Sequence, residues 1–425
     1  MTVMTTEIGP QQVLGDDLGF FLIAFAAACV RLLMGDPDVF ARMLTGMFAS
    51  AKTGFEISLG LAGIMTLWLG IMRIGERAGV IDLFARCVDP VMRHLFAGVP
   101  KGHPANGAMM MNVSANMLGL DNAATPLGLK AMRELQTLNP RSDTASDAQI
   151  MFIVLNTAGI TLIPTSVIAI RQTIALQQGL TGFNAADIFL PTLIATFISF
   201  TAGLLAVAWH QRLNLLRAPL LLAYGGLVLV MGLLFLWLDQ FPPERMASMA
   251  GLIGSGFIMT IITAFLLVGA LRRINVYEAF IEGAKDGFGV AVQIIPYLIA
   301  MLVAISVFRT TGILDLLLQG LGTLFAAVGL NTDFVPALPV GLMKILSGAG
   351  ARGLMVDVMT TYGVDSFPGK LAAIIQGSTE TTFYVLAVYF GSVNIRNTRY
   401  ALGCALFADV IGLIGAIAVA YLFFH

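Results

Sequence analysis

Residues 51–84 read "AKTGFEISLGLAGIMTLWLGIMRIGERAGVIDLF", and residues 284–317 read "AKDGFGVAVQIIPYLIAMLVAISVFRTTGILDLL". The two segments align without a gap at an offset of 233 residues. The first matches are Ala51, Lys52, Gly54 and Phe55 with Ala284, Lys285, Gly287 and Phe288. Self-similarity at a fixed separation is typical of a structural unit that occurs twice. The chain is therefore predicted to consist of two homologous halves.

The similarity continues beyond these segments. Ser114 matches Ser347 at the same offset, and Asn156 falls opposite Gln376 once an extra polar loop at residues 138–147 is allowed for. The predicted domains are a first repeat at residues 1–211, a linker at 212–245 and a second repeat at 246–425. The linker contains a predicted transmembrane helix at residues 218–238.

The composition predicts a membrane protein. Hydrophobic residues make up 57% of the chain and charged residues 12%, with a mean hydropathy of +0.86. Soluble domains have about 25% charged residues. Uncharged windows at residues 188–209, 218–238, 246–271 and 287–308 approach or exceed the ~20 apolar residues that cross a bilayer as a helix. The fold class is therefore an all-α polytopic integral membrane protein.

Each half is predicted to have the same order of elements. A first span leads through an amphipathic link to a second span, a short amphipathic helix, an interrupted region, a polar-centred span and a final span. In the first half these elements are expected at 18–34, 54–72, 80–96, 103–136, 148–170 and 188–209. In the second half they are expected at 246–271, 287–308, 313–328, 336–362, 371–390 and 400–424.

The interrupted regions are rich in Gly, Ala and polar residues. Backbone that leaves the helix at membrane depth is tolerated only inside protein or against a water-filled cavity. Secondary transporters break their helices in this way at corresponding places in two repeats. We therefore expect interrupted or re-entrant helices that face each other across a pseudo-two-fold axis.

Charge bias predicts the orientation. Residues 1–17 contain acidic but no basic residues, which favours the outside. Basic residues at 212, 217, 272 and 273 favour the cytoplasm. With an odd number of crossings in each half, the linker helix makes the two copies parallel. Inverted copies are the alternative, because the crossings of the interrupted regions are hard to count.

The second polar-centred span, "IIQGSTETTFYVLAVYF" at residues 374–390, contains Glu380. An ionisable residue inside a span costs about 2.5–3.5 kcal/mol on insertion scales, so it usually faces a cavity or a partner. Glu380 is either a site for a solute, cation or proton, or a structural partner of Arg352 or Lys344. The first half has Asn156 and Thr157 at the equivalent place, without a charge.

We predict that the interrupted regions and polar-centred spans meet near the midplane around a polar cavity. The first half would contribute Asn116, Asp121, Asn122, Asn156 and Thr157. The second half would contribute Ser347, Arg352, Gln376, Ser378, Thr379, Glu380 and Thr381. Asp121 and Asn122 are equally suited to capping the following helix. Arg352 and Lys344 are suited either to an anionic solute or to neutralising nearby acids.

Catalytic and cofactor motifs are not indicated. "GAGARG" at residues 348–353 fits a dinucleotide-binding pattern, but it lies between apolar helices rather than in a βαβ unit. The sequence has no Walker A motif and no clustered histidines or cysteines. We therefore expect no enzymatic activity, no cofactor, no catalytic residues and no metal site.

Four longer segments resemble known families. "NMLGLDNAATPLGLKAMRELQTLNP" (116–140) is similar to the spore maturation protein A family. Segments 283–309, 350–363 and 374–401, which include "GARGLMVDVMTTYG" and "IIQGSTETTFYVLAVYF", are similar to the spore maturation protein B family. The chain resembles a fusion of the two. This resemblance implies a nucleoside-recognition, or gate, domain and a membrane gate or permease, without specifying a substrate.

These features lead to a functional expectation. The leading hypothesis is a multi-pass bacterial inner-membrane protein that acts as a secondary transporter of a small polar solute, nucleoside-like or anionic. The alternative is a non-transporting scaffold that affects envelope or cell-wall maturation. The expected partners are the solute, a coupling cation or proton and membrane lipid, with no nucleic acid; a homo-oligomer is left open.

Overall fold

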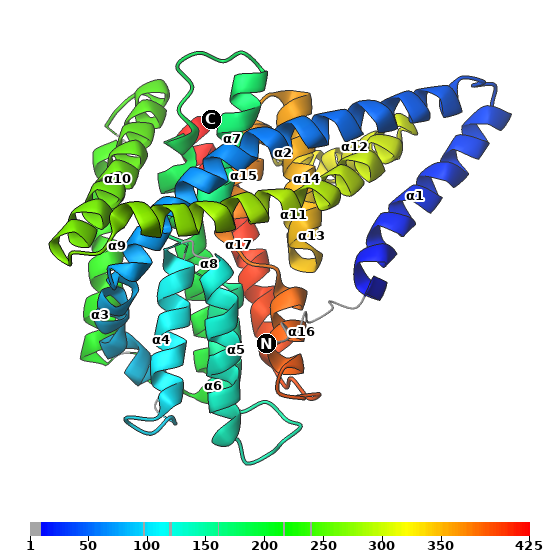
Figure 1. Cartoon of the computed structure of the whole chain (residues 1–425). Helices are drawn as coiled ribbons and strands as arrows, with labels where there is room; N and C mark the ends of the chain where they lie inside the picture. Colours follow the sequence, from blue (N-terminus) through cyan, green and yellow to red (C-terminus); the bar gives the residue numbers. More distant parts are fainter. Residues whose placement is uncertain (1–9, 97, 119–120, 160, 216, 239) are drawn as a thin grey trace.

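The computed structural model describes the backbone of residues 10–425 except 97, 119, 120, 160, 216 and 239 (Figure 1). Within this part of the chain, the side chains of residues 10–18, 20, 121–123, 219, 243 and 244 lie outside the description. Among the described residues, seven helices are long and apolar enough to cross a membrane. The predicted all-α polytopic fold is confirmed.

The two halves contain the same series of helices. The first half comprises α1 (Pro10–Leu33), α2 (Val39–Arg77), α3 (Val80–Leu95), α4 (Pro104–Met117), α5 (Asp121–Thr137), α6 (Asp147–Thr157), α7 (Thr165–Gln177) and α8 (Phe189–Gln211). The connecting helix is α9 (Ala218–Leu238). The second half comprises α10 (Pro243–Leu271), α11 (Val276–Thr310), α12 (Ile313–Ala327), α13 (Leu338–Leu346), α14 (Gly348–Tyr362), α15 (Phe367–Ser378), α16 (Thr382–Gly391) and α17 (Ala401–Phe424).

The two longest helices, α2 and α11, pack against each other and run in opposite directions (Figure 1). Glycines allow their backbones to approach closely. A Cβ on Gly54 would lie 3.3 Å from the Cα of Ile299, and a Cβ on Gly287 would lie 2.8 Å from the Cα of Thr66. Both Gly54 and Gly287, and Thr66 and Ile299, are separated by the repeat offset of 233. The two contacts are therefore images of each other about a pseudo-two-fold axis.

The first helix of each half packs against the other half. Gly79 and Gly312, which follow α2 and α11, have φ angles of 71° and 76°. In this left-handed region glycine is favoured because it lacks a Cβ. A Cβ on Gly79 would lie 2.6 Å from the Arg272 guanidinium, and one on Gly312 would lie 2.8 Å from that of Arg31. At the turn after its longest helix, each half therefore packs against an arginine of the other half, and the two contacts are symmetric.

The last helices of the two halves, α8 and α17, are also antiparallel. The Ser199 hydroxyl donates to the carbonyl of Ala408 at 3.2 Å, and a Cβ on Gly412 would lie 2.8 Å from that of Ser199. A pseudo-two-fold axis that pairs equivalent helices in opposite directions is perpendicular to them. Because these helices cross the membrane, the axis lies in the membrane plane and the two repeats are inverted.

The predicted parallel arrangement is therefore wrong. That prediction assumed an odd number of crossings in each half. The arrangement of the described helices gives each half an even number of crossings. In the first half, α2 and α8 are two of the seven long apolar helices, and the shorter α1 and the α6–α7 pair supply two further crossings (Figure 1). The interrupted region adds none, because α4 and α5 form a helical hairpin that returns to the end from which it entered (Figure 1). The single crossing of α9 then turns the second half over.

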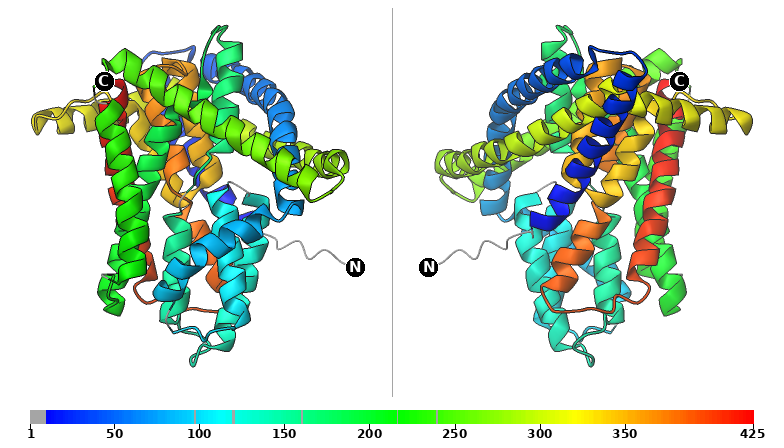
Figure 2. Two further views of the ribbon diagram at one scale, coloured as in Figure 1. Left: turned by 90° about the vertical axis from the view of Figure 1, so that its left-hand side faces the viewer. Right: turned by 90° about the vertical axis from the view of Figure 1, so that its right-hand side faces the viewer.

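Basic residues indicate which end faces the cytoplasm. The lower end of Figure 1 contains α3, the loops before α4 and α6, the α8–α9 connection and the loop before α17. Figure 2 shows α3 toward this end, whereas its counterpart α12 projects at the upper end. The basic residues of the lower segments are Arg86, Arg93, Lys101, Arg141, Arg212, Arg217, Arg396 and Arg399. By the positive-inside rule we expect this end to face the cytoplasm. α1 begins toward this end and rises to the other, so this expectation differs from the outside position that the acidic residues of 1–17 favoured.

The helix crossing leads to a stability prediction. Gly287→Ala places a Cβ 2.5 Å from the carbonyl oxygen of Met65, so α2 and α11 must move apart. We expect this variant to lose about 1–3 kcal/mol, the usual cost of overpacking. Gly289→Ala is the matched control, because a Cβ there meets no atom within 4 Å. Thermal unfolding of the purified proteins checks the pair, and equal melting temperatures would contradict the proposed close approach.

The inverted topology is tested with two equivalent positions. Cys87 is exposed on α3, and Gly320 occupies the equivalent position on α12 with open space around a Cβ. In variants without Cys29 and Cys404, we expect an impermeant maleimide to label Gly320→Cys from outside intact cells. In contrast, Cys87 should react only after the membrane is opened. Labelling of both positions from the same side would support parallel repeats.

Candidate functional site

Each polar-centred span is broken near its middle. Residues 158–164 separate α6 from α7, and residues 379–381 separate α15 from α16. In the second break, Thr379 (φ −140°, ψ 164°) and Thr381 (φ −81°, ψ 101°) have extended backbones. β-Branched residues favour this conformation. The hydropathy pattern predicts one continuous span in each region, whereas the structure has two half-helices in each.

The two breaks meet at the centre of the molecule. The backbone N–H of Glu380 donates to the carbonyl of Thr157 at 3.0 Å, which links the second break to the first. The Thr196 hydroxyl on α8 donates to the carbonyl of Gly159 at 2.7 Å. These bonds satisfy backbone groups that lipid cannot satisfy. The two breaks therefore cross at membrane depth and form a polar centre in which these backbone groups are hydrogen-bonded.

Hairpin 1, formed by α4 and α5, reaches the first break with its tip. The N–H of Leu162 donates to the carbonyl of Met117 at 2.9 Å. The Asn116 side-chain amide donates to Oδ1 of Asn156 at 2.9 Å. Two of the predicted site residues are thereby brought together.

Hairpin 2, formed by α13 and α14, enters from the upper end and reaches the second break (Figure 1). The Ser347 hydroxyl caps α14 by accepting the N–H of Gly350 at 3.1 Å. A Cβ on Gly348 would lie 2.7 Å from Oγ1 of Thr381. The N-terminal ends of α14 and α16, which carry partial positive charge, therefore both lie beside this break.

Glu380 is partly exposed and lies between the half-helices of the second span. None of the described side chains forms a hydrogen bond or salt bridge with its carboxylate, and its backbone N–H is bonded to Thr157. In the described part of the chain, neither Arg352 nor Lys344 forms a salt bridge with Glu380, although both residues have other interactions. Glu380 is therefore an accessible carboxylate at membrane depth.

The equivalent amides of the two halves differ. In the first half, Asn156 accepts from Asn116 and donates to the carbonyl of Phe152 at 2.8 Å. In the second half, the position of Asn116 is occupied by Ala349, and Oε1 of the buried Gln376 has no partner among the described residues. The amide at the first break is therefore hydrogen-bonded within the first half, whereas Oε1 of Gln376 at the second break is left to accept a further hydrogen bond.

The remaining predicted residues have varied roles. The hydroxyls of Thr157 and Ser378 donate to carbonyls within their own helices, at 3.0 and 3.1 Å. The methyl group of Thr379 packs beside Gly412, and a Cβ added to Gly412 would lie 3.1 Å from this methyl group. Asp121 and Asn122 are the first residues of α5, but their side chains lie outside the described residues. Their predicted ligand or cap role stays a prediction.

Arg352 lines a small cavity of about 50 Å³ between α11 and α14. The other lining residues are Ile294, Tyr297, Leu298 and Ala349. The cavity is mainly apolar, with the guanidinium as its charged group. Arg352 also has a further interaction within the protein, so both interpretations of this residue remain predictions.

Two buried polar contacts were missing from the predicted site. The Thr382 hydroxyl donates to Oδ2 of Asp409 at 2.6 Å. The Asn112 amide of hairpin 1 donates to the carbonyl of Ala124 at 2.7 Å and reaches the Tyr389 hydroxyl on α16 at 3.4 Å. A charged or amide residue within an apolar run was the available signal for Asp409 and Asn112. Only the fold shows that α16 supplies Thr382 and Tyr389 as their partners.

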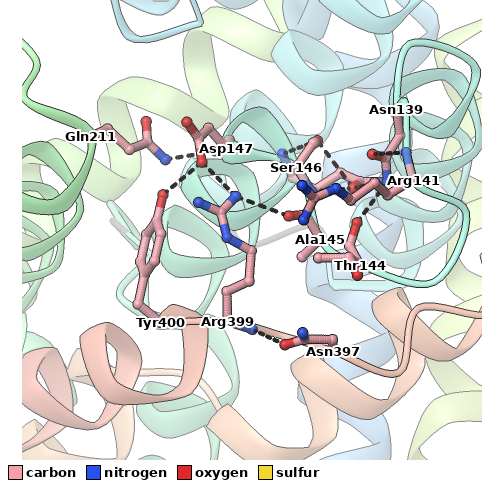
Figure 3. A network of polar contacts seen from close by, with 11 residues as sticks. Asn139, Arg141, Thr144, Ala145, Ser146, Asp147, Gln211, Asn397, Arg399 and Tyr400 are labelled. Atoms are coloured by element: carbon pink, nitrogen blue, oxygen red, sulfur yellow. Dashed lines mark hydrogen bonds and ion pairs between the residues drawn. The ribbon is translucent and has the colours of Figure 1, made fainter.

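Polar networks at both ends hold the two halves around this centre. At the lower end, Asp147 of α6 accepts from Arg399 at 2.7 Å and from the Tyr400 hydroxyl at 3.0 Å (Figure 3). Burial raises the pKa of Tyr400 to about 12, so this hydroxyl stays a donor at physiological pH. At the upper end, the fully buried Arg171 pairs with Asp187, and Asp187 also pairs with Lys370 of the second half at 3.7 Å.

Together, the fold and the site define a multi-pass membrane protein with an inverted internal repeat, re-entrant hairpins and crossed broken helices. The family described as nucleoside recognition (Gate) matches residues 58–173 and 291–396, which together cover just over half of the chain. The chain therefore belongs to the nucleoside-recognition Gate family and contains its domain twice. This is the family that the sequence resemblance indicated.

Two relatives from Bacillus subtilis (strain 168) are similar to parts of the chain. Spore maturation protein B is 45% identical over 167 residues, which cover 39% of this chain and 92% of that protein. Spore maturation protein A is 42% identical over 153 residues, which cover 36% of this chain and 75% of that protein. The predicted resemblance to both families is confirmed.

The different environments of the two amides lead to a prediction. Asn156→Leu removes the acceptor of the part-buried Asn116 amide, and leaving a buried donor unpaired costs about 1–3 kcal/mol, with the lower end expected here. Gln376→Met removes an oxygen without a partner and keeps the side-chain length, so the free energy of unfolding should change little. Thermal unfolding of the two variants without added solute compares them. A larger loss for Gln376→Met would contradict the assignment of Asn156 as the structural amide.

Proposed function

We propose that this protein is a secondary transporter of a small polar solute, which binds where the two broken spans cross. The observation that carries the proposal is the Glu380 carboxylate, partly exposed and without a hydrogen-bonding or ion-pairing partner among the described side chains. An unpaired acid at membrane depth is costly unless it faces water or a ligand. A purely structural role would not require this exposure.

The surrounding groups favour a solute with hydrogen-bond donors and acceptors. Glu380 accepts from hydroxyl or amine groups, and Oε1 of Gln376 accepts in addition. The N-terminal ends of α14 and α16 favour electron-rich groups. These features suit a nucleoside-like solute, and the family description, nucleoside recognition, supports the same class. An anionic solute is the second candidate, favoured by Arg352 in its cavity beside α14.

The cellular setting follows from the same proposal. The inverted fold, the seven long apolar helices in the described chain and the bacterial relatives favour the bacterial inner membrane. Transport by alternating exposure of a central site needs no covalent chemistry, so we propose a non-enzymatic role. The alternative is a non-transporting scaffold that affects envelope maturation, and its support is that both relatives are named spore maturation proteins.

Glu380→Gln tests the transport function. Purified protein in liposomes is supplied with a soluble metabolite extract and radiolabelled uridine, and internal solutes are measured by mass spectrometry and counting. We expect the variant to lose uptake while its melting temperature is unchanged, because no ion pair is broken. Glu56→Gln is the matched control, since Glu56 is an exposed glutamate on α2 whose only ion-pair partner in the described chain is Lys52, at 3.7 Å.

Three outcomes would contradict the proposal. Undiminished uptake by Glu380→Gln would remove Glu380 from the solute site. A correctly folded wild-type protein that takes up no component of the extract would favour the scaffold. A lower melting temperature for Glu380→Gln alone would instead assign the carboxylate a structural partner.

A further inference from the structure

We propose that Asp409 is the binding site of a proton, and that its charge controls hairpin 2 through Lys344. Asp409 is only 4% exposed and lies in the middle of α17, directly behind the second break. Its Oδ2 accepts from the Thr382 hydroxyl at 2.6 Å, whereas its buried Oδ1 has no hydrogen bond in the described structure. Coupling of this proton to solute movement rests on the proposed transport function.

The packing of α13 on α17 brings Lys344 to the level of Asp409. A Cβ on Gly341 would lie 2.5 Å from the Leu413 side chain, which fixes the register of the two antiparallel helices. One turn nearer the midplane, α13 presents Lys344 and α17 presents Asp409, because residues three and four apart share a helix face. The two charges act on each other. Lys344 is buried and has further interactions.

Other charges on the surrounding elements lie farther from Asp409. α17 packs against α6, α8, α10, α13, α15 and α16. Their described titratable groups, apart from Lys344, are Asp147, His210, Arg245 and Lys370 near helix ends, Tyr384 and Tyr389 on α16, and Glu380 in the break before it. The Asp121 side chain lies outside the described residues. Lys344 is thus the charged group that faces Asp409 from the adjacent hairpin.

This charged pair has no counterpart in the first half. Lys344 corresponds to Met111 at the offset of 233. "GLLAVAW" at 203–209 aligns with "GAIAVAY" at 415–421 at an offset of 212, which places Phe197 opposite Asp409. Two apolar residues therefore replace the acid and the base. A pair needed only for folding would be expected in both copies.

Protonation changes the forces within this cluster. The ionised carboxylate attracts Lys344 and holds the α13 arm of hairpin 2 against α17. A proton on the unpartnered Oδ1 removes the negative charge and leaves Oδ2 able to accept from Thr382. The attraction on α13 then weakens, and the hairpin tip beside Glu380 is released. Proton binding and access to the solute site are thereby linked.

The proton site is tested directly by infrared difference spectroscopy during acidification of the full-length protein in nanodiscs. We expect a carboxylic acid C=O band of a buried group in the wild type and its loss in Asp409→Asn. Asp315→Asn is the control, because Asp315 is exposed on α12. An unchanged band in Asp409→Asn would overturn the proposal. This measurement needs no solute, so it is independent of the transport function.

Release of the hairpin is tested by labelling Ser347→Cys in a variant without the three native cysteines. At one fixed pH, we expect Asp409→Asn to increase the maleimide reaction rate several-fold, and an unchanged rate would overturn the control of hairpin 2. Should Asp409→Asn fail to fold, the double variant Lys344→Gln/Asp409→Asn removes the unbalanced charge. In that case the double variant must show the loss of the band and the faster labelling.

Discussion

The hydrogen bond from the Glu380 N–H to the Thr157 carbonyl links two helix breaks that neither half could bury alone. An unpaired backbone group in lipid costs several kcal/mol, and each break leaves such groups at the middle of a span. The pseudo-two-fold arrangement solves this problem by placing one break against the other, with Thr196 covering a further carbonyl. The antiparallel glycine contacts of α2 and α11 and the cross-half networks at both ends hold this crossing in register. The polar centre is thus a consequence of the repeat and of its inversion.

The two halves share a fold but differ in their chemistry. The first half closes its break with the Asn116–Asn156 bond and has apolar residues where the second has Lys344 and Asp409. The second half has Ala349, an unsatisfied Gln376 and an accessible Glu380 at the same places. Exact symmetry would put two acids close together at the axis and would raise the cost of burying either one. Divergence of the copies allows one half to supply rigidity and the other half to supply charge.

Much of the fold was predictable because its determinants are local or repeated. Hydropathy and the offset of 233 identify the paired helices, and α3 (Val80–Leu95) and α12 (Ile313–Ala327) match the expected amphipathic helices closely. The inversion was missed because a re-entrant hairpin and a crossing helix have the same apolar composition. In the site, the polar run around Glu380 was visible in the sequence. The Thr382–Asp409 bond was not, because it depends on how α16 packs against α17.

The connecting helix α9 explains how one polypeptide can contain inverted copies. Each half begins and ends at the same side of the membrane, so a loop alone would insert both copies in the same orientation. One additional crossing reverses the second copy, and any even number would not. Most of α9 is exposed to its surroundings, which suits a helix whose main requirement is to cross the bilayer. In Bacillus subtilis the two relatives are separate proteins, whereas this chain joins the corresponding parts at equal stoichiometry. The fusion therefore fixes both the relative orientation and the pairing on which the crossing of the two breaks depends.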